Sequence, residues 1–400
     1  MTTAPARPFH LSRTNTASAL SMPGMVGVYF GLRACITFVF FRADPQAGTQ
    51  VSIALNLLLL VVVVFYSAGP AVLTLRQAMQ TRPFKLVLFF LGLSLCSLLW
   101  TEAQSTLVAA SYWAALAADV LLVFFVFRVE PAEVASNSII KGFVWGVFLL
   151  ALVGWIAPTM PDLRIGDDDF LSPNVIGFEC AMGALFCQYL APQGARWKWL
   201  GAALAITLLR SLSKTSILAF AVMEAFYLTR NKSISRGAKV ALTAAALLVL
   251  SAFSGLLMAY YSVYTHAGTQ VETLTGRTPI WIAAFTFAVQ EPWLGHGFHS
   301  FHTVVPVFGS YQAWHAHNEL LHQFFNYGIV GVVLVLALYI SLVRQARQAL
   351  SHPLRLATQS LLLLVFVRSF TDTERFDLSL PLWLITTLSL ALAHPAEFHA

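Results

Sequence analysis

Charge is scarce in this 400-residue sequence: 10% of the residues are Asp, Glu, Lys or Arg, whereas 58% are hydrophobic. A water-soluble protein carries about a quarter charged residues, because its surface must stay hydrated. The mean hydropathy of +0.72 points in the same direction. The composition therefore excludes an ordinary soluble protein and predicts an integral membrane protein.

Cysteine is also rare, and the sequence has no visible secretory signal peptide. The four cysteines lie within apolar stretches and form no Cys-x-x-Cys pair, which argues against a disulfide framework or a cysteine zinc site. Residues 1–24 are polar, contain Arg7 and Arg13, and lack a short apolar core followed by a small-residue cleavage site. We interpret residues 1–24 as a cytosolic tail.

Apolar stretches are abundant, and many are long enough to cross a hydrocarbon layer of about 30 Å. The seventh and eighth are short and predict a tight hairpin around Ser211–Ser213. Together they predict an all-α membrane protein with about 12 transmembrane helices. The twelve stretches are 25–41, 51–69, 84–100, 111–127, 140–158, 173–191, 198–210, 213–229, 239–260, 319–343, 355–371 and 377–393.

The basic residues give the orientation of these spans. With the N-terminus in the cytosol, sixteen of the 24 Lys and Arg residues fall at the cytosolic side, as the positive-inside rule requires. Topology, rather than nucleic-acid binding, thus explains the net charge of +6. The predicted organisation is the tail, transmembrane helices 1–9 over 25–260, a long outer segment at 261–318, and transmembrane helices 10–12 with a cytosolic C-terminus over 319–400. Thr278-Pro279 predicts an interfacial helix within the outer segment.

Basic residues at the outer side need a different explanation. Arg210 and Lys214 bracket the hairpin among serines and threonines, Arg277 precedes the interfacial helix, and Arg368 ends the eleventh stretch without an adjacent carboxylate. Cations and hydroxyls at a helix N-terminus can bind a phosphate or diphosphate. The alternative is contact with lipid headgroups. We interpret Arg375 as structural, because its loop contains three carboxylates.

Histidines concentrate in the outer segment, where seven of the eleven lie between positions 266 and 322. His317 directly precedes an apolar span, where an imidazole could take a proton from a hydroxyl at neutral pH. An interfacial histidine bonded to loop carbonyls is the alternative. The spacing of His296, His299 and His302 and the run Asp167–Asp169 raise the question of a metal site. Gly295 and Gly297 interrupt a regular helix, and acidic loops are usually solvated, so we predict no metal.

Four ionisable residues interrupt apolar spans, and such residues should be paired or should line a cavity. We expect Arg33 to pair with Asp119. The other two are Glu179 and Glu224.

Several short motifs resemble those of the O-antigen ligase and Wzy-type polymerase superfamily. They are Gly276-Arg277-x3-Trp281, Pro292-Trp293-Leu294-Gly295-His296-Gly297 with Ser300-Phe301, and His317-Asn318-x-x-Leu321 running on to Gly328. Ser213-Lys214-Thr215 resembles a segment of ExoQ-like exopolysaccharide polymerases. The resemblance covers roughly residues 165–330 in motifs and the whole chain in topology.

The resemblance implies a GT-C-like fold and a metal-independent, inverting glycosyltransferase without a cofactor. The donor would be a glycan linked to undecaprenyl diphosphate, and the active site would face the periplasm from the bacterial inner membrane, within the segment 261–318. The family pattern maps diphosphate binding onto Arg210, Lys214 and Arg277, and it makes His317 the base or the group that orients the acceptor. We add Arg368 from its position. Expected partners are membrane lipids, chain-length regulators and export proteins, with no nucleic acid. Trp281, Trp293 and Trp314 are sugar-stacking candidates or interface anchors.

Two alternatives to a polymerase stay open. An O-antigen ligase would transfer the finished glycan to a lipid A core from the same donor site. A polytopic transporter or flippase would gather ionisable residues at the membrane midplane, and Arg33, Asp119 and Glu224 keep that class under consideration.

Overall fold

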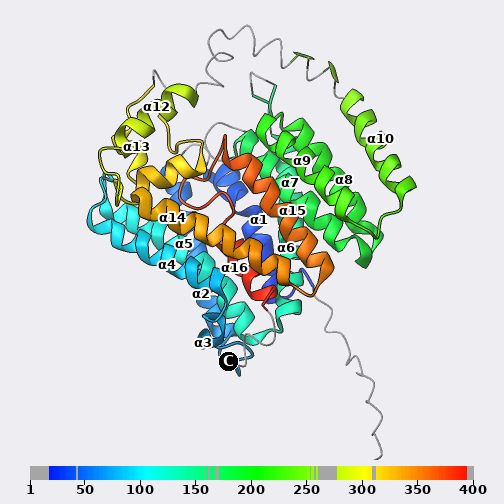
Figure 1. Cartoon of the computed structure of the whole chain (residues 1–400), viewed down its shortest axis with the longest axis horizontal. Coiled ribbons are helices and arrows are strands. Elements are labelled where there is room, and N and C mark those ends of the chain that lie inside the picture. Colours follow the sequence, from blue (N-terminus) through cyan, green and yellow to red (C-terminus); the bar gives the residue numbers. More distant parts are fainter. Residues whose placement is uncertain are drawn as a thin grey trace, which may run out of the picture.

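The described part of this chain is built from helices. The computed structural model describes residues 18–41, 44–157, 159–160, 163–166, 171–252, 254–255, 258–259, 277–308 and 312–393. The α-helices are α1 (Met22–Phe41), α2 (Pro45–Tyr66), α3 (Leu75–Ala78), α4 (Arg82–Cys96), α5 (Thr106–Val129), α6 (Ala132–Ile156), α7 (Pro173–Leu190), α8 (Ala195–Arg210), α9 (Lys214–Arg230), α10 (Arg236–Ala252), α12 (Arg277–Ala288), α13 (Phe301–Val304), α14 (Glu319–Gln348), α15 (His352–Ser369) and α16 (Leu382–Ala391) (Figure 1). Two 3-10 turns, Ser97–Leu99 and Ala191–Gln193, follow α4 and α7.

The predicted apolar stretches coincide with helices. Each of the twelve stretches has its described residues on or around α1, α2, α4 to α10, α14, α15 or α16, and the predicted hairpin is the turn between α8 and α9. Among the described residues, seven helices are long and apolar enough to cross a membrane: α1, α2, α4 with its 3-10 turn, α5, α6, α7 and α14. The chain is thus a helical membrane protein, whereas twelve crossings stay a prediction.

Close packing of α1 on α6 fixes the centre of the bundle. Gly27 and Gly31 of α1 face Gly142 and Gly146 of α6, so each helix carries a Gly-x-x-x-Gly pair at the contact. A Cβ atom on Gly142 would lie 1.9 Å from the carbonyl oxygen of Gly24. In a membrane, where lipid and side chains are equally apolar, such close backbone approach is what holds two helices together.

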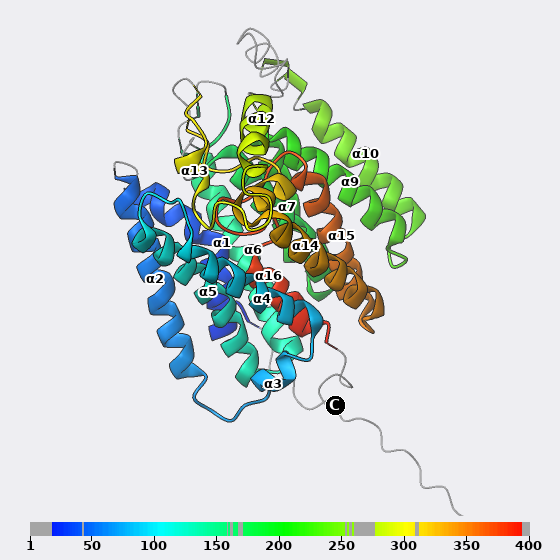
Figure 2. The ribbon, with the colours of Figure 1, turned by 60° about the vertical axis from the view of Figure 1, so that its left-hand side comes forward.

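The bundle has two distinct ends. Both views put α3 at one end and α12 with α13 at the opposite end (Figures 1 and 2). The predicted interfacial helix is α12, in which Ile280 and Ala284 are buried while Ile282 and Phe285 are exposed. An apolar exposed face of this kind suits a helix that lies against lipid at the membrane interface.

A break in α14 docks the outer segment onto the bundle. Gly328 interrupts this helix with a φ of 61°, and its neighbour Ile329 donates its backbone N–H to the carbonyl of Pro292 at 2.8 Å. One turn earlier, the N–H of His296 donates to the carbonyl of Phe325 at 2.9 Å. These bonds use backbone groups that the break releases from the helix, so the loop after α12 is held firmly over the first turns of α14.

Candidate active site

A cavity of about 940 Å³ is lined in part by the first residues of α12. Its wall comes from the first halves of α2, α5 and α7, the first turn of α9, the middle of α1, the end of α15, the loop before α14 and the loop residues 372–377. These elements are far apart in the sequence. The cavity therefore unites loop residues and intramembrane residues in one site.

Four of the residues singled out for chemistry line this cavity from separate elements. Lys214 begins α9, Arg277 begins α12, His317 precedes α14, and Arg368 lies at the end of α15. The N-terminus of a helix carries a partial positive charge, which adds to the charge of Lys214 and of Arg277. Six Lys or Arg residues line the cavity against five carboxylates, so cations are in slight excess, and an anion could bind beside Lys214 and Arg277.

The hydroxyls of the hairpin serve the fold more than the cavity. Ser213 donates to the side chain of Asn174 at 2.9 Å and to Ser216 at 3.0 Å, and Ser211 donates to the carbonyl of Leu208. These serines are buried, and of the hairpin turn only Leu212, Lys214 and Thr215 reach the cavity wall. The expected shell of hydroxyls around an anion is therefore reduced to Thr215.

Arg210 lies apart from the other predicted diphosphate ligands. Its Nη1 donates to the carbonyl of Leu163 at 2.8 Å, and it is absent from the cavity wall. In this structure Arg210 fastens the loop after α6 to the end of α8. Sequence reasoning grouped it with Lys214 because only a short turn separates them, but the two side chains leave that turn in different directions.

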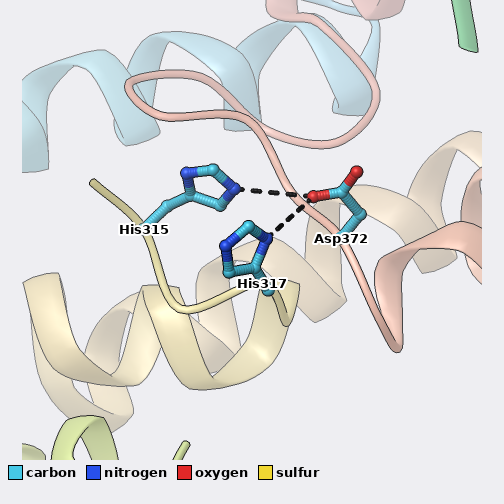
Figure 3. A group of neighbouring side chains, drawn as sticks. All are labelled: His315, His317 and Asp372. Atoms are coloured by element: carbon cyan, nitrogen blue, oxygen red, sulfur yellow. Dashed lines mark hydrogen bonds and ion pairs between the residues drawn. The ribbon is translucent and has the colours of Figure 1, made fainter. Parts of the chain in front are cut away.

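His317 is held by a carboxylate that the sequence did not single out. The Nδ1 atom of His317 lies 3.3 Å from Oδ1 of Asp372, and Nε2 of His315 lies 3.5 Å from the same oxygen (Figure 3). The two imidazoles come from the loop before α14 and turn toward Asp372, which lies in the loop after α15. Asn318 ties these loops together, because its Nδ2 donates to the carbonyl of Phe370 at 3.0 Å.

The protonation of this cluster follows from its surroundings. Burial alone would raise the pKa of Asp372, but the Arg368 guanidinium and the neighbouring His315 and His317 imidazoles hold it well below its usual range. Burial, reinforced by the neighbouring His317, lowers the pKa of His315 well below its usual range. Asp372 is therefore an anion at neutral pH, and His315 is a neutral imidazole.

Arg368 does have adjacent carboxylates, which corrects the expectation from sequence. Its Nη2 lies 3.3 Å from Asp372 and 3.0 Å from Glu374, and its guanidinium stacks on the ring of Phe178 at 3.9 Å. The residue lines the cavity but is only 2% exposed. Two carboxylates compensate its charge and tie Arg368 to the loop after α15, whereas among the described residues its Nε and Nη1 have no hydrogen-bond partner. Diphosphate binding by Arg368 stays a prediction. The guanidinium of Arg375 lies over the ring of Trp314, with its Cζ atom 5.5 Å from the ring centroid.

The structure does not bring the three predicted tryptophans to the cavity wall. Trp293 is 69% exposed, and Trp314 stacks on His302 with ring centroids 4.5 Å apart. Neither these two nor Trp281 is a lining residue. Sugar stacking on them stays a prediction, and the aromatic rings that do line the cavity include Tyr29 and Tyr112.

Two of the three evenly spaced histidines contact each other, because the rings of His299 and His302 pack edge to face with centroids 4.7 Å apart. His296 bonds to Glu102 at 2.6 Å, His299 also stacks on Tyr112 and on Phe376, and His302 stacks on Trp314. Burial lowers the pKa of His299 to about 4, helped by the nearby His302. His266 and Asp167–Asp169 lie outside the described residues.

Among the described residues, one cluster could hold a metal ion. The ligand atoms of His315, His317 and Asp372 lie within 4.8 Å of one another. The Arg368 guanidinium bonds to the other oxygen of Asp372, and its positive charge opposes a cation at this place. His317 and Arg368 bond to Asp372, whereas the two ring nitrogens of His315 have no hydrogen-bond partner among the described residues.

Three of the four ionisable residues inside the bundle are placed as predicted. Arg33 and Asp119 form a direct ion pair, and both line the cavity together with Glu179. Glu224 is not a lining residue and accepts a hydrogen bond from Gln188 at 2.7 Å. The four cysteines are free thiols.

A comparison with known protein families covers the central third of the chain. No curated protein matches the sequence. Lys214, Arg277 and His317 fall within the matched segment, whereas Arg368 and Asp372 follow it. Residues 199–336 match the Wzy_C family model, whose description is O-antigen ligase, and this match confirms the resemblance that the motifs predicted.

Proposed function

We propose that this protein is a polysaccharide polymerase of the bacterial inner membrane. It would transfer a glycan from undecaprenyl diphosphate to a sugar hydroxyl of another lipid-linked repeat unit, at the periplasmic face. One observation carries the proposal: three candidate residues from different elements line one cavity. Lys214 starts α9, Arg277 starts α12, and His317 precedes α14. The proposal includes twelve membrane crossings and a GT-C-like arrangement.

The cations suit the leaving group of this reaction. As the acceptor oxygen attacks the anomeric carbon, the bond from that carbon to the diphosphate oxygen breaks, and the diphosphate keeps the electron pair. Negative charge therefore grows on the diphosphate, where Arg277 and Lys214 would stabilise it in a site sheltered from water. The guanidinium of Arg277 can bind two phosphate oxygens at once, whereas the ammonium of Lys214 acts as a point charge. A single displacement of this kind inverts the anomeric centre and needs no metal.

His317 is the proposed base. Because Asp372 is an anion, the proton of a neutral His317 imidazole belongs on Nδ1, which faces the carboxylate at 3.3 Å. Nε2 then carries the lone pair that takes the proton of the acceptor hydroxyl. Asp372 fixes this tautomer and stabilises the imidazolium that forms, and it acts through His317 without touching the substrate.

A ligase is the second candidate, because the matched family model is described as O-antigen ligase. Ligation would use the same donor cavity and differ in the acceptor, a lipid A core. A flippase or transporter, the third class, gains less support. The intramembrane charges Arg33 and Asp119 are paired with each other.

One reconstitution separates these functions. Purified protein in liposomes is incubated with lipid-linked repeat units alone, or with added lipid A core. A ladder of glycan lengths supports the polymerase, and a single transfer to lipid A core supports the ligase. Movement of the lipid across the bilayer without a new glycosidic bond would refute both and support the flippase.

A further inference from the structure

The cavity has a second side that differs from the cationic one. On α2, Thr49, Ser52 and Asn56 recur at the spacing of one helical face, and on α5 the same spacing aligns Tyr112 with Asp119. All five residues line the cavity. Two polar stripes on adjacent helices thus face one space from within segments that are otherwise apolar.

This side is polar but its charges are compensated. Asp119 forms an ion pair with Arg33 and accepts a hydrogen bond from Nδ2 of Asn56 at 2.9 Å. The same Nδ2 donates to the carbonyl of Ala115, also at 2.9 Å. These contacts fix the amide of Asn56 between α2 and α5. A fixed array of amide, hydroxyl and paired charges offers hydrogen bonds without a net charge.

One hydrogen-bond acceptor on this side of the cavity has no partner among the described residues. Asn56 is 3% exposed, and among the described residues its Oδ1 has no hydrogen-bond partner. A buried polar atom without a partner destabilises a protein, and it is a candidate for bonding to a ligand. Since Oδ1 can only accept, the complementary ligand group is a donor such as a hydroxyl.

The chemistry of the two sides selects different parts of one substrate. Lys214 and Arg277 suit an anionic diphosphate, whereas Ser52, Asn56 and the paired Asp119 suit an uncharged group with many hydroxyls. A lipid tail would leave these buried polar groups without partners, which is unfavourable. Tyr29 and Tyr112, which also line the cavity, add the aromatic surface on which sugar rings pack.

We propose that the cavity face formed by Thr49, Ser52, Asn56, Tyr112 and the Arg33–Asp119 pair is a sugar-binding subsite for the lipid-linked substrate. This inference rests on the proposed function, because it takes the diphosphate to be held by Arg277 and Lys214. The sugar belongs either to the donor or to the acceptor. Both present the same hydroxyl chemistry, and the experiment below separates them.

The test measures binding to the purified full-length protein by native mass spectrometry. The probes are sugar-free undecaprenyl diphosphate, the glycan-carrying form extracted from native membranes, and the lipid-free oligosaccharide released from it. Asn56→Leu keeps the size of the side chain but removes its amide, and Ser52→Ala removes one hydroxyl with little risk to folding. Leu58→Ala, at a position of α2 where the leucine is 59% exposed, is the matched control.

We expect Asn56→Leu to weaken binding of a sugar-containing probe about tenfold and Ser52→Ala to weaken it less, as expected for one lost hydrogen bond. Competition with sugar-free undecaprenyl diphosphate then assigns the sugar: a glycan-carrying lipid that it displaces from the protein is the donor, and one that it leaves bound is the acceptor. Binding of sugar-free undecaprenyl diphosphate should not change. Unaltered binding of both glycans, or an equal loss for the sugar-free lipid, would overturn the subsite. Failure of the wild-type protein to bind undecaprenyl diphosphate would instead refute the proposed function.

Discussion

Replacing Asp372 with asparagine tests the proposed base and its orientation together. The change keeps the size of the side chain but removes the charge that lies 3.3 Å from Nδ1 of His317. An asparagine amide can present a donor to that nitrogen, which would move the imidazole proton to Nε2 and disable it as a base. We expect slower glycan transfer with unchanged binding of undecaprenyl diphosphate, because Arg277 and Lys214 are untouched.

The size of the effect can be estimated from the geometry. For unit charges 3.3 Å apart, an effective dielectric constant of about 20 gives an attraction of about 5 kcal/mol between Asp372 and a protonated His317. That energy corresponds to a rate change of between about 10³- and 10⁴-fold. It agrees with the roughly 10²- to 10⁴-fold that a well-placed base contributes. We therefore expect the single-turnover rate of Asp372→Asn to fall by about a thousandfold.

A double variant distinguishes orientation of His317 from a general structural effect. If Asp372 acts through His317, then His317→Ala combined with Asp372→Asn should be no slower than His317→Ala alone. Glu374→Gln is the matched control, since it also removes a carboxylate from Arg368, at 3.0 Å, and keeps Asp372 beside His317. Losses that multiply in the double variant, or an equal loss in Glu374→Gln, would contradict the role given to Asp372.

Four further predictions follow from the same structure. Arg277→Ala should lower transfer by about 10²- to 10³-fold while the protein stays inserted, whereas Arg196→Ala, outside the cavity wall, should leave transfer intact in the same assay. Gly142→Val should destabilise the fold by about 1–3 kcal/mol in thermal unfolding, but Gly92→Ala, whose Cβ meets nothing within 4 Å, should not. EDTA should leave transfer unchanged, and inhibition reversed by Zn²⁺ would instead make the cluster around His315 a metal site. Because the pKa of His315 is lowered in the folded protein, the unfolded chain binds more protons below about pH 6.5; stability should fall there, and less so in His315→Gln.

Much of the fold could be predicted from the apolar pattern. The twelve stretches coincide with helices, and the hairpin between α8 and α9 lies where the short Ser211–Ser213 turn predicted it. The ion pair of Arg33 with Asp119 was also predictable, because a buried charge in a membrane requires a partner. The pairs Gly27/Gly31 and Gly142/Gly146 are a sequence signal for the close approach of α1 to α6, which the length of an apolar stretch does not show.

The site was predictable only where a residue stood out from its local sequence. Asp372 did not stand out, since a carboxylate in an outer loop is usually solvated. A signal was present, because Arg368 and Asp372 are four residues apart at the end of a helix, a spacing that favours an ion pair. Thr49, Ser52 and Asn56 were not predicted for another reason. Their spacing of three and four residues marks a polar face only when the stretch is considered as a helix.

The motifs that carry the family resemblance combine two kinds of residue. Arg277 and His317 line the cavity and bear its proposed chemistry, whereas Gly295, Gly297 and Gly328 have positive φ angles and set the backbone course of the loop after α12 and of the break in α14. A Cβ on Gly328 would lie 2.3 Å from the carbonyl of Trp293, and one on Gly297 would lie 2.7 Å from Cα of Thr101.

Those glycines allow the loop after α12 to enter the break in α14, and His317 lies two residues before the start of α14. A residue such as Gly328 can therefore be essential for transfer without approaching the substrate. Substitution of Gly328 should lower both the transfer activity and the thermal stability of the fold, whereas substitution of Arg277 should lower the transfer activity alone. Motif membership by itself does not separate these roles, but the backbone geometry at each position does.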